Sequence, residues 1–410
     1  MSTVTTHRTA PLWKFAEVSP PMPEFNDLTE SDEVTFIPLE DVWPTNKADD
    51  FRTVPWEKRL NGYTPFRRGD LLLPKVTPTV THGRTMITDT ATELGVASTE
   101  VYTVRARPGA DSRWLAYLLV GTEFLGLAGA SVQGTGGLKR ISTQFVESYP
   151  LPDASPDEQR AIADYLDRET AEIDAMSADL DEMEKLLTER RRTAVTAAFN
   201  QFSTTAPLWK FAKVSPSTPG IYDLDKGEDV TFIPLEDVWT NQKPGVFKVA
   251  PWEDKLASYT HFESGDVLLP KVTPTVTHGR AMVANVTTEL GVATSEIYTL
   301  RPSERTNPDW LAFFLTSQTF LDEAGVSVLG TGGLKRISTQ FVQSFPVPDM
   351  SRSEQDGLVK DIDRETTEID AMLADITELR DLLAERRAAV IAAAVTGQID
   401  IPTAEEPTHA

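Results

Sequence analysis

Cysteine is absent from the 410-residue chain, so the protein can form neither a disulfide nor a thiolate zinc site. A run of about 18 or more apolar residues, the length that a transmembrane helix needs, is absent as well. The N-terminal residues hold no apolar segment of the kind that a secretory signal requires. These absences predict a cytoplasmic protein that has no membrane among its partners.

Recognisable catalytic motifs are also missing. The sequence contains no Walker motif, no Gly-x-Ser-x-Gly elbow, no His-Glu-x-x-His and no Asn-Pro-Pro-aromatic methyltransferase motif. The glycine-rich stretch 134–142 fails the phosphate-loop pattern, because Leu138 precedes its lysine and Arg140 follows it. His82 and His278 have no ligand partners at useful spacing. We therefore expect no enzymatic activity, no metal site and no cofactor bound by this chain.

An excess of positive charge is the third absence. The net charge is −23, which taken alone argues against nucleic acid as a partner. The acidic residues, however, gather between residues 155 and 199, whereas basic residues gather in loops such as 58–84 and at Lys139 and Arg140. Because counter-ion release depends on local phosphate contacts, a positive face remains compatible with the negative total.

An internal repeat dominates the sequence. The segment Pro-Leu-Trp-Lys-Phe-Ala at residue 11 returns at residue 207, a shift of 196 positions. All eight tryptophans pair at the same shift, for example Trp43 with Trp239. The shift never changes, so neither copy has a net insertion. A period this long predicts a duplicated domain and excludes a solenoid.

Each copy has a mixed α/β pattern. Short stretches rich in Val, Ile, Leu and Thr predict strands at 33–43, 69–76, 85–89 and 100–105. The apolar stretch 114–127 predicts a buried helix, and the prolines of 149–153 predict an extended connector. The predicted divisions are a domain at 1–153, a helix at 154–200, a second domain at 201–349, a second helix at 350–396 and a tail at 397–410.

Two long charged helices follow the domains, at 155–199 and 351–395. Ser155 and Glu158, like Ser351 and Glu354, are spaced as a capping box. Apolar residues recur at alternating spacings of four and three, as in a helix that packs along another helix. Since the two stripes repeat at the 196 shift, we expect the helices to pack on each other. The predicted packing residues are Ile162, Leu166, Ile173, Met176, Leu180, Met183 and Leu187 in the first helix, and Leu358, Ile362, Ile369, Met372, Ile376, Leu379 and Leu383 in the second.

Two loops carry the chemistry suited to DNA. The stretch 69–84 combines Lys, Arg, Thr and His, which contact phosphates and base edges, although an edge strand with a polar face would have the same pattern. The stretch 134–142 combines a glycine nest with Lys139 and Arg140, which suits a backbone phosphate, although a plain tight turn is the alternative.

The order of these features resembles the specificity subunit of type I restriction–modification systems. The motifs that carry the resemblance are Phe-Ile-Pro-Leu-Glu-Asp at residue 36, Gly-Asp-Leu-Leu at residue 69, Ser-Thr-Glu-Val at residue 98, the loop at 134–141 and the Glu-Gln pairs at 158 and 354. The terminal Val-Thr-Gly-Gln-Ile-Asp is also typical of the family. The likeness covers nearly the whole chain. The similarity between the halves is a departure, because family members usually carry two dissimilar recognition domains.

The resemblance implies an α+β fold with two homologous target recognition domains, each followed by a long helix, the helices packing as an antiparallel coiled coil. It implies a non-catalytic chain that reads a split double-stranded DNA target, which should be nearly an inverted repeat because the halves are alike. The implied partners are two modification subunits, which would bind S-adenosylmethionine, and restriction subunits.

Within this reading, the residues expected to contact DNA come from both loops and both copies. They are Arg67, Arg68, Lys75, Thr77, Thr79, His82, Arg84, Thr135, Lys139 and Arg140, and in the second copy Lys271, Thr273, Thr275, His278, Arg280, Thr331, Lys335 and Arg336. A coiled-coil scaffold that binds only proteins is the alternative function. Its support is the net charge and the acidic helices.

Overall fold

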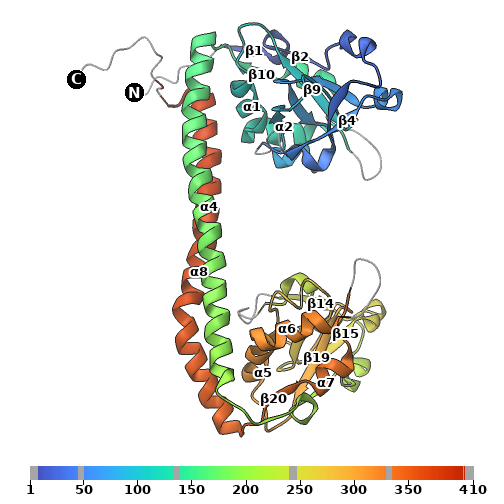
Figure 1. Ribbon diagram of the computed structural model, residues 1–410, viewed down its shortest axis with the longest axis vertical. Coiled ribbons are helices and arrows are strands. Elements are labelled where there is room, and N and C mark those ends of the chain that lie inside the picture. The colour runs from blue at the N-terminus through green and yellow to red at the C-terminus, as the bar shows by residue number, and fades with distance from the viewer. Residues whose placement is uncertain are drawn as a thin grey trace, which may run out of the picture. The chain divides into compact units, whose positions relative to one another are not determined.

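The computed structural model describes residues 8–44, 50–132, 139–239, 247–328, 335–399 and 401. It divides into two compact units, one formed by Met1–Ala178 with Leu379–Ala410 and the other by Asp179–Glu378 (Figure 1). Each unit holds one copy of the repeated domain and a part of each long helix, α4 (Pro156–Asn200) and α8 (Arg352–Val395).

The first domain contains two four-stranded sheets and a short two-stranded one. The order β2-β9-β6-β7 is antiparallel throughout, whereas in β4-β3-β8-β5 the central strands β3 and β8 run parallel. Strands β1 and β10 pair with each other. The strands are β1 (Thr9–Pro11), β2 (Ala16–Val18), β3 (Glu33–Ile37), β4 (Arg52–Pro55), β5 (Thr64–Arg67), β6 (Leu71–Pro74), β7 (Met86–Ile87), β8 (Leu94–Ala97), β9 (Val101–Ala106) and β10 (Pro150–Pro152).

Three short helices cover this domain: α1 (Ser112–Val120), α2 (Thr122–Ser131) and α3 (Thr143–Ser148). The sequence predicts one helix through this region, but the structure breaks it at Gly121, whose backbone is extended. No single described helix is long and apolar enough to cross a membrane; α1 and α2 together have the length and composition, but Trp114 and Phe124 of this pair lie in the domain core.

One close approach in the second sheet depends on glycine. A Cβ atom added to Gly95 of β8 would lie 2.1 Å from the ring of Phe66 on the neighbouring strand β5. Gly291 and Phe262 repeat this arrangement in the second domain, again at 2.1 Å. The ring therefore lies directly over the glycine backbone, and any side chain at this position has to displace it.

The second domain repeats the first element by element. Its sheets have the orders β12-β19-β16-β17, β14-β13-β18-β15 and β11-β20, with β13 and β18 parallel. Its elements are β11 (Thr205–Pro207), β12 (Ala212–Val214), β13 (Asp229–Ile233), β14 (Lys248–Pro251), β15 (Thr260–Glu263), β16 (Val267–Pro270), β17 (Met282–Val283), β18 (Leu290–Ala293), β19 (Ile297–Pro302), α5 (Pro308–Leu315), α6 (Gln318–Ser327), α7 (Thr339–Ser344) and β20 (Pro346–Pro348).

The long helices begin as the sequence predicts. The Ser155 backbone N–H donates to Glu158 at 2.7 Å and the Glu158 N–H donates back to the Ser155 hydroxyl at 3.3 Å. Ser351 and Glu354 repeat this capping box at 2.8 and 3.4 Å. Gln159, the residue after Glu158, is buried and accepts a hydrogen bond from the Asp111 N–H at 3.0 Å. It therefore connects the start of α4 to the start of α1.

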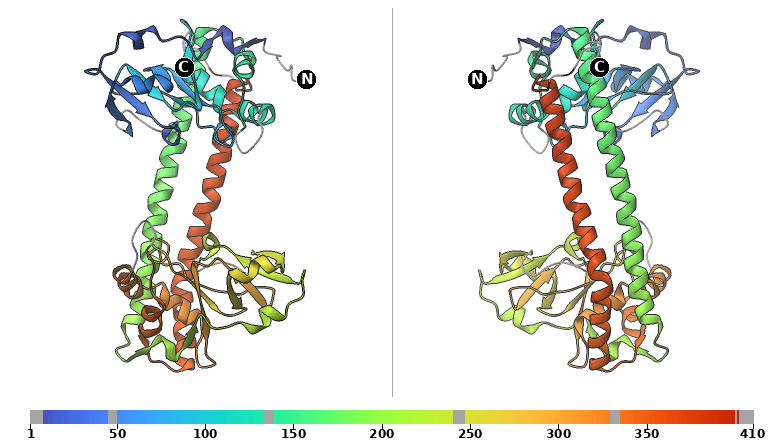
Figure 2. Two further views of the ribbon diagram at one scale, coloured as in Figure 1. Left: turned by 90° about the vertical axis from the view of Figure 1, so that its right-hand side faces the viewer. Right: turned by 90° about the vertical axis from the view of Figure 1, so that its left-hand side faces the viewer.

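Within each unit, α4 and α8 pack side by side and antiparallel (Figure 2). In the first unit Arg386 of α8 lies 3.4 Å from Glu169 of α4, and Arg387 pairs with Asp174. In the second unit Arg191 of α4 pairs with Asp370 of α8 at 2.6 Å. The Arg191–Asp370 pair repeats the Asp174–Arg387 pair, because Asp370 lies 196 positions after Asp174 and Arg191 lies 196 positions before Arg387. The expected fold, two repeated α/β domains with two paired long helices, is confirmed.

The buried stripe on each helix leaves out two of the seven predicted packing residues. On α4 it passes through Leu166, Thr170, Ile173 and Leu187, with Ser177 and Leu180 partly buried. The hydroxyls of Thr170 and Ser177 donate to carbonyls one turn back, at 2.7 and 2.9 Å, which lets these small polar side chains lie in the stripe. On α8 the corresponding residues are Ile362, Thr366, Ile369, Leu373, Ile376 and Leu383.

Four predicted packing residues therefore lie outside the stripe. Met176, Met183, Met372 and Leu379 are 44 to 51 % exposed. Ile162 and Leu358 pack, but each belongs to the core of its adjoining domain. The heptad pattern places Met176 and Met372 in the stripe, whereas the helices partly bury the next residue in each case, Ser177 on α4 and Leu373 on α8.

Candidate nucleic-acid interface

The structure brings the two candidate loops together. The backbone N–H of Thr77 donates to the Lys139 carbonyl at 3.0 Å, and the Ile141 N–H donates to the Lys75 carbonyl at 2.9 Å. An isolated β-bridge between Val76 and Arg140 lies between these two bonds. The stretches that the sequence presents separately therefore form one surface in the first unit. The second unit repeats it, with the bridge between Val272 and Arg336.

A charged cluster occupies this surface. Arg140 donates two hydrogen bonds to Glu100, at 2.8 and 2.6 Å, and Lys75 donates to the Thr99 carbonyl at 2.9 Å while lying over the ring of Tyr102 at 4.6 Å. Burial lowers the pKa of Lys75, and the hydrogen bond from Arg140 lowers the pKa of Glu100. Burial therefore works against the charge on Lys75, whereas Arg140 favours the charge on Glu100.

The same cluster recurs in the second unit. Arg336 donates to Glu296 at 2.7 and 2.8 Å, and Lys271 donates to the Ser295 carbonyl at 2.6 Å and lies 4.8 Å from the ring centre of Tyr298. Lys139 and Lys335 are exposed beside the two clusters. Each surface therefore carries three cationic side chains for one carboxylate, which is a local positive excess in an acidic protein.

Arg84 lies in the same loop, but it donates its hydrogen bonds to backbone carbonyls of the protein. Its guanidinium donates to the carbonyls of Leu39, Glu40 and Val42 at 2.7, 2.6 and 3.0 Å. It also stacks on Trp43, 4.2 Å from the ring centre, and burial lowers its pKa. Arg280 stacks on Trp239 in the same way at 3.7 Å. Most of the donors of Arg84 are thus committed within the protein.

The remaining predicted residues are distributed unevenly. Thr77 and Thr79 are partly buried and His82 is exposed, all next to the cluster in sequence, and Thr273, Thr275 and His278 match them in the second unit. Arg67 pairs with Glu24, and Arg68 donates to the Ala91 carbonyl at 2.7 Å, so neither shares a partner with the cluster. Thr135 and Thr331, with their glycine loops, lie outside the described residues.

The sequence does not predict a role for three residues that contact the cationic side chains: Glu100, Tyr102 and Trp43, with their equivalents Glu296, Tyr298 and Trp239. A signal was available, because Ser-Thr-Glu-Val at residue 98 stands out as a family-like motif. Residue type alone does not mark Glu100 as part of a phosphate-binding surface, however, because phosphate binding calls for cations. Its role becomes visible only when the structure places Arg140, 40 positions away in sequence, against Glu100.

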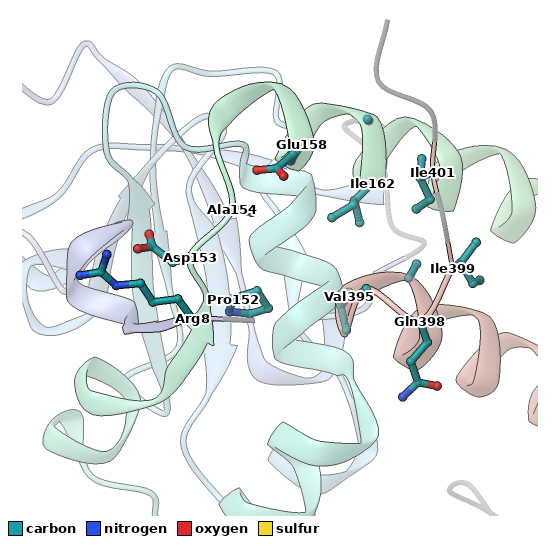
Figure 3. Close-up of a pocket in the computed structure, with 13 residues that line it drawn as sticks. Arg8, Pro152, Asp153, Ala154, Glu158, Ile162, Val395, Gln398, Ile399 and Ile401 are labelled. Atoms are coloured by element: carbon teal, nitrogen blue, oxygen red, sulfur yellow. The ribbon is translucent and has the colours of Figure 1, made fainter. Parts of the chain in front are cut away.

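A cavity of about 420 Å³ lies elsewhere in the first unit, where α4 begins and α8 ends (Figure 3). Ile162 of α4 lines it on one side, and Gln398 and Ile399, which follow α8, line it on another. None of the predicted DNA-binding residues lines this cavity. Among the described residues no group of three or more His, Cys, Asp or Glu side chains is arranged to hold a metal ion.

Comparison with known proteins identifies relatives by sequence and by fold. No protein-family model matches the chain. It is 27% identical over 150 residues to the specificity subunit of the type I restriction enzyme EcoAI of Escherichia coli, and 26% identical over 152 residues to that of EcoEI from the same organism. Each match covers 36% of this chain and about a quarter of the relative's own length.

A solved structure from a study of complex assembly in a type I restriction–modification system has a similar fold. The TM-score is 0.61 at 16% sequence identity, over 97% of this chain and all of that one. The HsdS subunit from Thermoanaerobacter tengcongensis has a TM-score of 0.47 at 16% identity, over 97% of this chain.

Proposed function

We propose that this chain, a member of the type I restriction–modification specificity-subunit family by its sequence and its fold, reads a bipartite DNA target for that system. Each repeated domain would read one half of the target. The chain would itself catalyse no reaction, and the methyl donor S-adenosylmethionine would be bound by modification subunits that assemble with it. Restriction subunits would join the same complex.

The duplicated charged surface supports this proposal most directly. A bidentate ion pair fixes the guanidinium of Arg140, burial and a carbonyl fix Lys75, and Lys139 remains exposed beside them. Cations held in place lose little side-chain freedom when they meet a phosphate, which favours binding. The contacts would position the duplex, and neighbouring side chains would read bases.

The likeness of the two surfaces supports a nearly palindromic target. Lys75, Glu100, Lys139 and Arg140 have identical equivalents in the second copy. Two similar readers would favour similar half-sites, which form a nearly inverted repeat if the readers meet the duplex in opposite orientations. Arg67 and Arg68 are replaced by Glu263 and Ser264, so any base read there differs between the half-sites.

The modification subunits would dock on an apolar edge of the helix pair. The Glu169–Arg386 ion pair marks this edge in the first unit. Met176 lies one heptad beyond Glu169, and Leu379 lies one heptad before Arg386, so in an antiparallel pair these two face each other along the same edge. With Leu382 one turn further they form the docking edge, and all three are 44 to 51 % exposed.

The second unit has the equivalent edge, made by Met372, Met183 and Leu186, which are 45 to 56 % exposed. Neither set is needed inside the helix pair, whose buried stripe runs elsewhere. Exposed apolar patches of this kind favour protein partners, and interface cores are more apolar than ordinary surface. Two equivalent edges suit two copies of one partner.

Docking can be tested by changing Met176 and Leu379 together to serine. We expect this variant to fold normally and to lose a modification subunit during size-exclusion chromatography of the co-expressed complex. Leu127→Ser is the matched control, because Leu127 is 45 % exposed on α2 and is not part of the docking edge. Equal retention of the modification subunits by both variants would argue against the docking edge.

DNA recognition can be tested with the complex of this chain and its modification subunits. We expect it to bind a duplex carrying the sequence methylated in the host more tightly than a random duplex of equal length. A complex that assembles fully but binds neither duplex would favour the alternative, a scaffold that binds only proteins.

A further inference from the structure

Two tryptophans in each copy are exposed, and one of them lies against an arginine of the loop that begins at Lys75 or Lys271. Trp56 and Trp114 are buried in the first domain, whereas Trp43 is 43 % and Trp13 is 57 % exposed. Trp239 and Trp209, the equivalents of the exposed pair, are 46 % and 60 % exposed. Trp43 and Trp239 join none of the apolar clusters in the described parts of the chain. The packing of the core therefore gives no reason for an indole at these positions.

The position of Trp43 follows from the parallel pair of strands. Strands β3 and β8 end side by side, and the Ser98 N–H donates to the Ile37 carbonyl at 3.0 Å just beyond their ends. The chain after β8 continues to Glu100 of the charged cluster, and the chain after β3 continues to Trp43. The Lys75 amine, which donates to the Thr99 carbonyl, lies at the same end. The indole and the cluster thus lie at one end of the sheet.

An arginine holds each of these two indoles in place. Arg84 stacks on Trp43 and is itself anchored by three carbonyls of the segment that carries the tryptophan. In the second unit Arg280 stacks on Trp239, and the indole N–H of Trp239 donates to the Glu236 carbonyl at 2.7 Å. An aromatic ring that is fixed and still exposed loses little entropy on binding, and tryptophan is enriched among residues that dominate interfaces.

We propose that Trp43 and Trp239 contact the target DNA through apolar packing on deoxyribose and base edges, and that Arg84 and Arg280 are positioning residues which hold the two indoles. This inference rests on the proposed function and refines the earlier expectation that the two arginines contact DNA themselves. The partner surface is the apolar part of duplex DNA, such as sugar carbons and thymine methyl groups. Contacts of this kind add affinity without neutralising a phosphate.

The test measures the affinity of the complete complex with its modification subunits for a duplex carrying the sequence methylated in the host, at several salt concentrations. We expect Trp43→Ala to weaken binding roughly tenfold, with the slope of log affinity against log salt unchanged. Trp239→Ala should do the same in the second copy. Trp13→Ala is the matched control, since it removes an equally exposed indole, and it should leave the affinity at the wild-type value.

Arg84→Lys tests the positioning role, because it keeps the charge and removes the planar fork that stacks and donates. We expect it to reproduce the loss of affinity of Trp43→Ala, again at constant salt slope. Trp43→Phe should also reduce the change in tryptophan fluorescence that accompanies DNA binding.

Equal affinities for Trp43→Ala, Trp239→Ala and Trp13→Ala would overturn the contact. Wild-type affinity in Arg84→Lys would overturn the positioning role. A wild-type complex that binds no duplex would instead count against the proposed function as a whole.

Discussion

The two units attach their domains to the long helices through different polar contacts. In the first unit Arg113 at the start of α1 donates to Asp164 and Asp167 of α4, each at 2.7 Å, and also to Asp111. Tyr117, one turn further along α1, donates to Asp167 at 2.8 Å, and burial raises its pKa to about 12. We call the contact between a domain and its long helix the joint. In the first unit, acidic side chains hold one basic side chain at the joint.

In the second unit the residue equivalent to Arg113 is Asp309, and that equivalent to Tyr117 is Phe313. The contacts are made instead by Asn307, which donates to Asp356 at 2.7 Å, and by Arg352, which donates to the Thr306 carbonyl at 3.0 Å. The joint has been rebuilt with other residues around the same backbone geometry.

The charged surface has not been rebuilt in this way. Lys75, Glu100 and Arg140 have identical equivalents with nearly identical distances in the second unit. The fold therefore tolerates exchange of charged contacts at the joints. The Arg140–Glu100 pair is the same in both copies, as a shared ligand would require.

The largest expected effect concerns packing that both units share. Gly95→Ala places a Cβ atom 2.1 Å from the Phe66 ring and should lower the free energy of unfolding by about 3 kcal/mol. Gly291→Ala should cost a similar amount. Urea denaturation measures both. Gly62→Ala is the control, because a Cβ at Gly62 meets no atom within 4 Å. Equal midpoints for Gly62→Ala and Gly95→Ala would show that the ring moves freely.

The second prediction compares the two charged surfaces. Changing Lys139 and Arg140 together to alanine should weaken DNA binding and reduce the salt slope by up to about 1.8, the value for two phosphates. The same change at Lys335 and Arg336 should have an equal effect. Filter binding of the full complex at several salt concentrations provides the measurement.

Lys58→Ala combined with Arg59→Ala removes the same charge from a different turn of the first domain and serves as the control. Its salt slope should match that of the wild type. If this control and the Lys139–Arg140 variant flatten the slope equally, only net charge matters and the charged surface has no special role.

The third prediction addresses the joints. Arg113→Ala removes the centre of the first joint and should lower the free energy of unfolding by about 1 kcal/mol, a modest amount because the side chain is 38 % exposed. Asp309→Ala at the equivalent position should not destabilise the chain. Urea denaturation distinguishes the two, and equal losses would mean that the joints are energetically alike despite their different charges.

The smallest expected effect depends on pH. Burial raises the pKa of Asp309, and burial followed by the charge of Asp309 raises that of Asp363. Such carboxyls bind their protons more tightly in the folded chain, so stability falls as pH rises from the ordinary aspartate pKa through the raised one. Asp309→Asn should therefore stabilise the protein at pH 7 and less at pH 4. The gain should be less than about 0.5 kcal/mol, because the carboxyl still reaches solvent, which screens its charge. An equal gain at both pH values would contradict this.

Much of the fold could be predicted from the sequence because it depends on periodicity and repetition. The 196 shift predicts two equal domains, and the capping boxes locate the starts of both long helices. The exposure of Met176 and Leu379 could not be predicted in this way. A heptad pattern identifies a face of a helix by its apolar residues, and it does not anticipate that Thr170 and Ser177 satisfy their hydroxyls within the helix and occupy the buried stripe.

The candidate site was predicted in part. Cationic loops could be found from residue type, and they include Lys75, Lys139 and Arg140. Two other features could not be found in this way: backbone carbonyls hold Arg84, and Glu100 holds Arg140. Both contacts join residues that are 40 or more positions apart, and local sequence patterns carry no information on such contacts.

Mapping the methylated sequences of the host tests the central claim most directly, since it reports what the two domains read in the cell. The account predicts one split motif whose halves are nearly an inverted repeat, separated by a spacer of unspecified sequence. Deleting the gene for this chain should abolish methylation at that motif. Two unrelated half-sites, or a motif that persists after the deletion, would contradict the claim that the repeated domains are equivalent readers of DNA.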